Sequence, residues 1–378
     1  MRIGIDANGL TARSGGIGRY AVNLINHIAG VVSPREQHEL FIFFHQSFDR
    51  SLVDEHSCIA FVDRFTRIKS NVLRKGIFLP HSLRSLNIDL FHGVDHIGLP
   101  FFPGERKCRY VLTVHDMITK LYPEKFTLKH RTIENTLRPL VLRNADRIIT
   151  VSRSTQNDLL EFFPQCAEKT RVIYQGVDPR FSPRNEHEVK TRLVKYSIDF
   201  PYALFLGTLE PRKNIVRVVQ GFLRAKEKRQ TEHKLVITGR RGWLFKGIIN
   251  QIEKESLSND IIFTGFVEDE DLPHFYTGAD IFLYPSLYEG FGLPVLEAMA
   301  CDTPVITSNL SSLPEVAGDA ALLIDPMNVE EIADSIVRLL TDDSLRRDMQ
   351  KKGSKRAEFF SWKRAAEQIL DLYEEAVE

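Results

Sequence analysis

The stretch Tyr284–Thr303, which reads YPSLYEGFGLPVLEAMACDT, decides how this 378-residue chain folds. Gly290 and Gly292 can adopt backbone angles that other residues avoid, and Pro294 suits the first turn of a helix, where its missing N–H costs nothing. The preceding letters, GADIFLYPS, are an apolar run typical of a strand. The stretch therefore predicts a strand, a glycine loop and a helix. The loop would lie at the carboxyl end of the strand, where open α/β sheets bind their ligands.

Two carboxylates flank this glycine loop. Glu289 precedes the turn, and Glu297 follows eight residues later, one turn into the predicted helix. The first N–H groups of a helix have no partner within it, so Phe291, Gly292 and Leu293 would present backbone donors at the positive end of the helix dipole. Such a loop suits a phosphate or a polyhydroxyl ligand. The two carboxylates would accept hydrogen bonds from the hydroxyls of that ligand. The alternative is that Glu297 only complements the dipole and that Glu289 is a surface residue.

Length and composition indicate a globular protein of two domains. The hydrophobic fraction is 43%, and 50 basic residues balance 50 acidic ones, so the charge gives no support for nucleic-acid binding. The four cysteines form no C-x-x-C pair, which argues against a zinc site or a disulfide framework and fits a reducing cytoplasm. Asp6 would fall inside the apolar core of a signal peptide, and no apolar run approaches the roughly 18 residues of a membrane span. We therefore expect a cytoplasmic chain.

Apolar runs alternate with amphipathic segments along the chain, which is typical of parallel α/β domains. Strands are expected at residues 2–7, 39–44, 88–93, 110–115 and 147–152, and again at 202–207, 234–239, 261–266, 280–285 and 304–308. Between the two sets, residues 176–188 contain two prolines and mixed charge without periodicity, so the interdomain linker is expected to begin near Gly176. The sequence thus predicts two Rossmann-like halves of similar size.

A second glycine loop lies near the N-terminus. The letters SGGIGRYAVNLINHI place Gly16 and Gly18 before an apolar helical face. Together with Ala21 they satisfy the G-x-G-x-x-G/A pattern, so a dinucleotide-dependent oxidoreductase is an alternative. However, the loop from Asn8 to Gly15 is too long for a tight strand-to-helix turn, and the next strand does not end in a ribose-binding acid. We therefore do not expect dinucleotide binding.

A pair of cations follows the first strand of the second half. That strand, YALFLG, ends in Gly207, and Asn214 can cap the helix that follows. Arg212 and Lys213 are thus held at a strand-to-helix junction. Two fixed cations there suit a diphosphate and the charge that develops on a departing nucleoside diphosphate. The alternative is an ordinary pair of surface cations.

A histidine ends a strand of the first half. The letters TVHDM place His115 at the carboxyl end of a β-rich run. A histidine there can bond a sugar hydroxyl or share a proton near neutral pH. A lone histidine is more often structural, but its place at a strand end favours a functional role.

Residues 64–88 contain no acid. Their basic residues alternate with apolar ones and are Arg64, Arg67, Lys69, Arg74, Lys75 and Arg84. Such a segment could lie on an anionic lipid surface. It could equally be a solvated helix face beside a loop.

Four motifs occur in order along nearly the whole chain: the glycine loop, the H-D pair, GTLEPRKN and EGFGLPVLEA. Together they resemble the glycosyltransferase family 4 group of retaining enzymes with the GT-B fold, and most of all bacterial mannosyl- and glucosyltransferases of O-antigen or exopolysaccharide synthesis. The resemblance implies two α/β Rossmann-like domains with parallel sheets facing across a deep cleft. It implies an acceptor-binding domain at 1–176 and a nucleotide-sugar-binding domain at 177–360. A C-terminal helix at 361–378 would pack back on the first domain.

The resemblance also assigns roles to single residues. The catalytic set that it implies consists of His115 at a hydroxyl of the transferred sugar, Arg212 and Lys213 at the diphosphate, and Glu289 at the sugar ring. The implied donor-binding set consists of Gly16 and Gly207, Val267 and Leu272 near the nucleobase, Phe291, Gly292 and Leu293 along the loop, and Glu297 at the ribose hydroxyls.

The implied reaction moves a hexose from GDP-mannose or UDP-glucose to a hydroxyl of a glycan or lipid-linked glycan. We expect no cofactor and no metal, because two cations and two helix dipoles would carry the charge of the leaving group. Retention in this family is usually explained by attack on the front face of the donor. The alternatives are a nucleotide-sugar-binding protein without catalysis, the oxidoreductase and a sugar-nucleotide epimerase. Besides the donor and acceptor sugars, the expected partner is the inner face of a membrane. We expect no binding of nucleic acid.

Overall fold

The computed structural model describes residues 1–7, 15–32, 38–44, 49–53, 59–62, 73–95, 97–102, 108–229, 231–242, 247, 249–250, 252 and 259–378. The contacts of the chain divide it into two compact units. Unit 1 consists of Met1–Gly176 and Ser361–Glu378, and unit 2 consists of Val177–Phe360.

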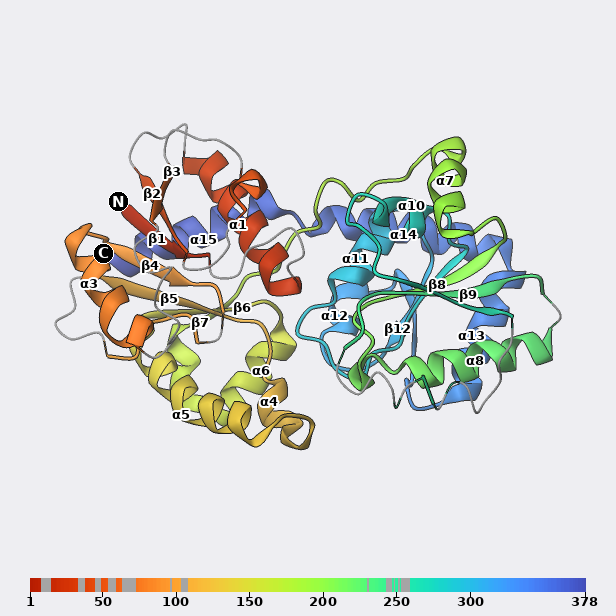
Figure 1. Ribbon diagram of the computed structural model, residues 1–378, viewed down its shortest axis with the longest axis horizontal. Helices are drawn as coiled ribbons and strands as arrows, with labels where there is room; N and C mark the ends of the chain where they lie inside the picture. Colours follow the sequence, from red (N-terminus) through yellow and green to blue (C-terminus); the bar gives the residue numbers. More distant parts are fainter. Residues whose placement is uncertain are drawn as a thin grey trace. The chain divides into compact units, whose positions relative to one another are not determined.

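Unit 1 is built on a parallel sheet that has seven strands in the described part of the chain, in the order β3-β2-β1-β4-β5-β6-β7. The strands are β1 (Arg2–Asp6), β2 (Glu39–Phe43), β3 (Ile59–Val62), β4 (Leu90–Gly93), β5 (Arg109–Val114), β6 (Arg147–Thr150) and β7 (Thr170–Val172). The central strands are continuous apolar runs because helices cover both faces of a parallel sheet. The terminal helix α15 packs with α1 on one face, while α5 and α6 lie on the other (Figure 1).

The described helices of unit 1 are α1 (Gly16–Val32), α3 (Leu79–Ser85), α4 (Ile118–Leu121), α5 (Leu128–Asn144), α6 (Arg153–Phe162) and the terminal helix α15 (Trp362–Val377). A π-helical turn at Arg74–Phe78 precedes α3.

Unit 2 repeats this design with six strands among its described residues, in the order β10-β9-β8-β11-β12-β13. The strands are β8 (Tyr202–Leu206), β9 (Lys234–Thr238), β10 (Ile261–Gly265), β11 (Ile281–Tyr284), β12 (Val305–Ser308) and β13 (Ala321–Ile324). The helices are α7 (Glu186–Leu193), α8 (Ile215–Lys228), α10 (Leu272–Thr277), α11 (Leu293–Ala300), α12 (Leu313–Ala317), α13 (Val329–Thr341) and α14 (Asp343–Phe359). Helices α8 and α13 pack together on one face, and α10, α11 and α14 cover the other (Figure 1).

Every strand range expected from the sequence contains an observed strand. The expectation missed β3, β7 and β13, which are edge strands of the two sheets. β3 and β13 have only four residues each, and strands so short give a weak pattern in the sequence. β7 has only three residues, and none of them is fully buried.

The order of each sheet reverses at one point, which is where α/β sheets form a ligand crevice. In unit 1 the reversal lies between β1 and β4, and in unit 2 it lies between β8 and β11. GTLEPRKN follows β8, and EGFGLPVLEA follows β11 and continues into α11, so the fold brings these two motifs to the same edge of the sheet.

The terminal helix belongs to unit 1 rather than to the unit that precedes it in sequence. Trp362 at its start lies edge-on to Tyr20 of α1, with ring centroids 5.5 Å apart. The backbone nitrogen of Trp362 also passes so close to Gly176 that a Cβ atom there would lie 2.1 Å from it. Only glycine fits at position 176, where the chain leaves unit 1.

Candidate active site

The cations of the GTLEPRKN motif are fixed by their short turn. Residues Pro211–Lys213 form a 3₁₀ turn, and Asn214 follows in the left-handed conformation with φ 59°. The Lys213 side chain is directed back toward the end of β8, where its Cε would lie 3.8 Å from a Cβ on Gly207. The chain thus folds both cations over the carboxyl end of β8.

Glu289 bridges both cations. Lys213 Nζ donates to Glu289 Oε1 at 2.6 Å, and Arg212 Nη1 donates to Glu289 Oε2 at 2.7 Å. Arg212 also donates to the Tyr288 carbonyl at 2.7 Å and to Glu210 Oε1 at 2.6 Å. Two positive and two negative charges therefore balance within one cluster.

Burial and the neighbouring charges shift the pKa values of the groups in this cluster. Burial alone would raise the pKa of Glu289, but the Arg212 guanidinium and the Lys213 ammonium outweigh it and hold the pKa at about 2. Burial, and then Arg212, lower the pKa of Lys213, while Glu289 opposes them. For the Arg212 guanidinium burial again lowers the pKa, and Glu289 and Glu210 more than restore it, so the pKa lies above its ordinary value. Glu289 is thus ionised at any pH near neutrality.

Tyr284 completes the cluster from the end of β11. Its hydroxyl accepts a hydrogen bond from Lys213 Nζ, and the same ammonium lies 4.8 Å from the centroid of its ring. Burial, and after it Glu289, raise the pKa of this phenol well above its ordinary value, so it stays protonated. Tyr284 and Glu210 belong to the cluster, although the sequence interpretation gave neither a role.

The glycine loop before α11 has the predicted form. Gly292 has φ 112°, which favours glycine, and Pro294 lies in the first turn of α11. Ser312 Oγ donates to the carbonyls of Glu289 at 2.9 Å and of Phe291 at 2.7 Å. Because C=O and N–H of a trans peptide point in opposite directions, the N–H of Gly292 points away from Ser312. The serine was not predicted as part of the site, and it orients the backbone donors there.

Glu297 lies apart from this ion cluster. It belongs to α11 and is only 2% exposed, and its Oε2 accepts a hydrogen bond from the Tyr276 hydroxyl at 2.8 Å. Its carboxylate contributes, after burial, to the raised pKa of about 12 of the Cys301 thiol. The two glutamates therefore have different surroundings, one ionic and one hydroxylic. Binding of ribose hydroxyls by Glu297 stays a prediction.

The residues expected near the nucleobase are buried. Val267 follows β10 and Leu272 begins α10, and both side chains are almost inaccessible. Any contact that they make with a base would therefore use their backbone groups.

Asn214 has a different role from the one expected. It begins α8, but its side chain accepts no hydrogen bond from the backbone N–H groups of that helix, and its Oδ1 accepts one from the Arg217 side chain at 3.1 Å instead. Its amide instead donates to the carbonyls of Pro285 at 3.1 Å and of Pro326 at 2.6 Å. The predicted cap is wrong because the left-handed backbone turns the amide inward. There Asn214 fastens the loop after β11 next to the cations.

His115 of unit 1 is held by its surroundings. Its Nε2 lies 2.7 Å from the carbonyl oxygen of Val94, which can only accept, so Nε2 carries a proton. The Tyr20 ring meets the imidazole edge-on, with centroids 4.8 Å apart. Gly16 is exposed and begins α1, so its backbone lies at the positive end of a 17-residue helix.

Part of the basic segment 64–88 points into the protein, whereas the sequence predicts that its cations face lipid or solvent. Arg64, Arg67 and Lys69 lie outside the described residues, and Arg74 and Lys75 are buried. Lys75 Nζ donates to the Ile97 carbonyl at 2.7 Å, and it lies 3.7 Å from an oxygen of Asp6 and 3.9 Å from one of Asp95. For these two cations the prediction of a lipid-facing or solvated position is wrong. Lys75 lies near acids that follow or end β1 and β4, and the charges of the same two acids, Asp6 and Asp95, act on Arg74.

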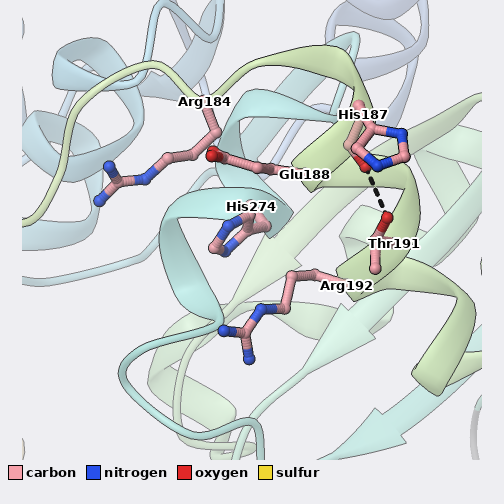
Figure 2. A pocket seen from close by; sticks show the side chains of 6 residues that line it. All are labelled: Arg184, His187, Glu188, Thr191, Arg192 and His274. Carbon is pink, nitrogen blue, oxygen red and sulfur yellow. Dashed lines mark hydrogen bonds between the residues drawn. The ribbon is translucent and has the colours of Figure 1, made fainter.

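A separate cavity of about 380 Å³ lies between α7 and α10 of unit 2 (Figure 2). It is lined by Arg184, His187, Glu188, Thr191, Arg192 and His274. Figure 2 shows the His274 ring between the side chains of Arg184 and Arg192. Arg192 is paired with Asp271 at 3.0 Å, and Glu188 brings a further negative charge to the lining, so the charges balance. No predicted site residue lines this cavity, and we assign no ligand to it.

Among the described residues, no cluster of three or more His, Cys, Asp or Glu side chains has the arrangement of a metal site. No helix in the described ranges combines the length and the apolar character that a membrane crossing needs.

Comparison with known proteins identifies the class. A sequence model described as "Glycosyltransferase Family 4" matches residues 14–181, and one described as "Glycosyl transferases group 1" matches residues 194–356. The chain is 33% identical over 372 residues to O-antigen chain mannosyltransferase B of Escherichia coli, with 95% of each chain covered. It is 29% identical over 266 residues to serotype-specific mannosyltransferase WbdA of Escherichia coli, which covers 69% of this chain and 33% of WbdA.

Solved structures share the whole fold. Sucrose-phosphate synthase from Thermosynechococcus elongatus superposes with a TM-score of 0.78 at 20% identity, covering 99% of this chain and 98% of that one. HepE of Anabaena, in complex with UDP and glucose, gives 0.76 at 18% identity, with 98% of each chain covered. WaaG, a glycosyltransferase involved in lipopolysaccharide biosynthesis, gives 0.75 at 16% identity, with 99% of each covered. The predicted GT-B fold is confirmed.

Fold and sequence together define a glycosyltransferase. The match to the Escherichia coli mannosyltransferase over almost the entire chain also shows the family: the chain belongs to glycosyltransferase family 4. The resemblance inferred from the four motifs is thus confirmed.

Proposed function

We propose that this glycosyltransferase is a retaining hexosyltransferase that uses a nucleoside diphosphate sugar. It would glycosylate a hydroxyl of a glycan or lipid-linked glycan in polysaccharide synthesis. The single observation that carries the proposal is the buried cluster of Arg212, Lys213 and Glu289 at the carboxyl ends of β8 and β11. The mannosyltransferases among the relatives favour GDP-mannose, and the UDP and glucose bound by HepE make UDP-glucose the second candidate.

Donor binding would exchange the partners of the cations. Glu289 and Glu210 already balance the charges of Arg212 and Lys213, so a diphosphate adds negative charge to a neutral cluster. Its oxygens would replace Glu289 on Lys213 Nζ and Arg212 Nη1. The displaced carboxylate would turn to the sugar and accept hydrogen bonds from its hydroxyls. Glu289 would thus hold the cations in place before binding and the sugar afterwards.

The transfer itself breaks the bond between the anomeric carbon and a phosphate oxygen. A bond from that carbon to the acceptor oxygen forms on the same face, and the proton of the acceptor hydroxyl passes to the donor phosphate. Arg212 and Lys213 would stabilise the charge that grows on the leaving diphosphate. His115 would accept a hydrogen bond from a hydroxyl of the transferred sugar at Nδ1, since its Nε2 donates to Val94.

The leaving-group charge would need no divalent ion, because two cations and the dipole of α11 face it. We therefore expect the rate of transfer to be unchanged by a chelator at millimolar concentration. A rate that falls with the chelator and returns with added Mg²⁺ or Mn²⁺ would contradict this part of the proposal.

A lipid-linked acceptor would bring the protein to a membrane, and the structure changes which residues we propose for that contact. Leu73, just before the π-helical turn, is 49% exposed, Ile77 within the turn is 59% exposed, and Phe102 is 65% exposed. Phe102 lies beside the same turn, since a Cβ on Gly76 would be 3.7 Å from its ring. We propose that this apolar patch, Leu73, Ile77 and Phe102, contacts the inner membrane face, with exposed Arg84 as one nearby cation.

The test of the proposed function is a transfer assay with GDP-mannose, UDP-glucose and ADP-glucose on an extracted polysaccharide acceptor. Release of nucleoside diphosphate, together with an NMR spectrum in which the new linkage keeps the anomeric configuration of the donor, is expected for one of them. An inverted linkage would refute retention. Tight donor binding without release in the presence of acceptor would favour a nucleotide-sugar-binding protein without catalysis.

A further inference from the structure

Four polar side chains in unit 1 form a continuous buried chain of hydrogen bonds. The Tyr373 hydroxyl lies 2.5 Å from His92 Nδ1, and His92 Nε2 lies 2.7 Å from Thr113 Oγ1. The Thr113 hydroxyl lies 3.0 Å from the hydroxyl of Tyr20. None of the four residues is more than 2% exposed. The chain is therefore isolated from solvent along its whole length.

This hydrogen-bonded chain joins four elements that lie far apart in sequence. Tyr373 belongs to the terminal helix α15, His92 to β4, Thr113 to β5 and Tyr20 to α1. A buried polar group is costly unless its hydrogen bonds are made, so such a network favours one arrangement of the elements it joins. It sets the position of Tyr20 relative to β5.

The hydrogen-bonded chain ends beside His115. The Tyr20 ring meets the His115 ring edge-on at 86°, and the Val94 carbonyl fixes the opposite part of the imidazole at Nε2. Thr113 precedes His115 by two residues and points to the same side of the strand. The imidazole is thus oriented by one backbone group and by one tyrosine that the network holds.

His92 takes part as a neutral ring. Burial, and then the neighbouring His115, lower its pKa to about 3. A neutral imidazole donates from one nitrogen and accepts at the other, so His92 can link two hydroxyls without bringing a charge into the interior. The network therefore keeps the surroundings of His115 uncharged.

We propose that Thr113, His92 and Tyr373 are positioning residues, which hold Tyr20 and through it fix the orientation of His115 toward the hexose of the donor. This proposal rests on the role of His115 proposed above. It gives the terminal helix a part in the reaction, because Tyr373 of α15 anchors the far end of the network.

Substitutions of Thr113 separate the hydroxyl from its packing. Thr113→Val keeps the shape of the side chain and removes the hydroxyl, whereas Thr113→Ser keeps the hydroxyl and removes a methyl group. We expect transfer to fall about tenfold in Thr113→Val, because the change removes both hydrogen bonds of the Thr113 hydroxyl, and to stay near wild type in Thr113→Ser. The reverse ranking would show that packing matters and would overturn the proposal.

The matched control is Thr150→Val on the neighbouring strand β6. Thr150 is also fully buried, and its hydroxyl has no hydrogen-bond partner. We expect it to transfer like the wild type. Tyr373→Phe, at the far end of the network, should lower transfer in the same sense as Thr113→Val, and a wild-type rate in Tyr373→Phe would refute the part assigned to α15.

Binding measurements distinguish positioning from a general loss of structure. In Thr113→Val we expect weaker binding of the nucleotide sugar and unchanged binding of the nucleoside diphosphate alone, because His115 would contact only the sugar. Equal weakening for both ligands would overturn the proposal. In a His115→Ala background Thr113→Val should have no further effect, and an additive loss would show that it acts independently of His115. Wild-type transfer in His115→Ala would refute the role of His115 instead, and no transfer by any variant or by the wild type would refute the proposed function.

Discussion

The two units hold their candidate site residues by opposite means. At the end of β8 and β11, unit 2 places two cations and two carboxylates in direct contact, and the opposing charges hold the pKa of Glu289 at about 2. Around His115, unit 1 uses neutral hydroxyls, one carbonyl and an aromatic edge. The difference suggests a division of work, in which unit 2 would meet the charge of a diphosphate and unit 1 would orient a group that meets sugar hydroxyls. Variants that remove contacts in one unit or the other test this division.

The largest effect is expected from Glu289→Ala. It removes the carboxylate from Arg212 and Lys213 and leaves one buried and one partly buried cation with only Glu210 as a charged partner. Breaking a buried ion pair costs about 3–5 kcal/mol, so we expect a lower midpoint of thermal unfolding as well as complete loss of transfer. Calorimetry and the transfer assay measure both. A variant with full stability and activity would show that the cluster is not the site.

Lys213→Met should abolish transfer with less damage to stability. Glu289 keeps Arg212 as its partner, and the methionine fills much of the space of the lysine stem. We expect loss of the rate without a large change in unfolding. Lys190→Met, which removes an exposed lysine paired with Glu186, is the matched control and should transfer like the wild type, because surface pairs contribute little. Equal activity in both variants would contradict the role of Lys213.

The pH dependence of stability should differ between the two units. His92 has a pKa of about 3 in place of 6.5, so its contribution is complete above pH 6.5 and is lost as the pH falls toward 3. Glu289 has a pKa of about 2 in place of 4.5, so its contribution is complete above pH 4.5 and is lost as the pH falls toward 2. We therefore expect His92→Gln to flatten the slope of unfolding free energy against pH between 6.5 and 4.5, and Glu289→Gln only below 4.5.

Urea unfolding measures these slopes, followed by circular dichroism for the whole chain and by tryptophan fluorescence for unit 1. The chain has two tryptophans, Trp362 in unit 1 and Trp243, whose surroundings lie outside the described residues. In a Trp243→Phe background Trp362 reports unit 1 alone. If His92→Gln left the slope of this signal unchanged, the lowered pKa of His92 would be wrong.

The smallest effect concerns the apolar patch of Leu73, Ile77 and Phe102. Replacing Ile77 and Phe102 by serine removes exposed apolar surface without touching the ion cluster or His115. We expect a several-fold lower fraction bound to anionic vesicles in a sedimentation assay, since burial of apolar area drives such contacts. Transfer to a water-soluble acceptor should not change. Equal vesicle binding in wild type and variant would remove the patch from the proposal.

The comparison also explains what the sequence could predict. The positions of charged residues at strand ends can be predicted from the sequence, because Arg212, Lys213 and Glu289 belong to short motifs between clearly predicted strands and helices. Their mutual pairing was not predicted, since a motif does not show which charges touch when no ligand is bound. The contacts of His115 could not be predicted from the sequence. His92 and Thr113 are single polar letters within apolar strands, and Tyr373 lies far away in the chain, so only the fold brings them together.

Two errors have a similar origin. Asn214 was expected to cap a helix, and Lys75 was expected at a surface, because both interpretations used local sequence alone. In the structure their partners come from other elements, at Pro326 for Asn214 and at Asp6 for Lys75. Local patterns predict the elements well, but the partners of buried polar groups depend on tertiary contacts.

The central claim is that the donor diphosphate binds to the cations held by Glu289. It is tested most directly by isothermal titration of GDP-mannose and UDP-glucose into the wild type, Lys213→Met and Lys190→Met. We predict that one nucleotide sugar binds the wild type and Lys190→Met with equal affinity and binds Lys213→Met at least tenfold more weakly. Equal affinity for all three proteins would place the diphosphate elsewhere and contradict the account.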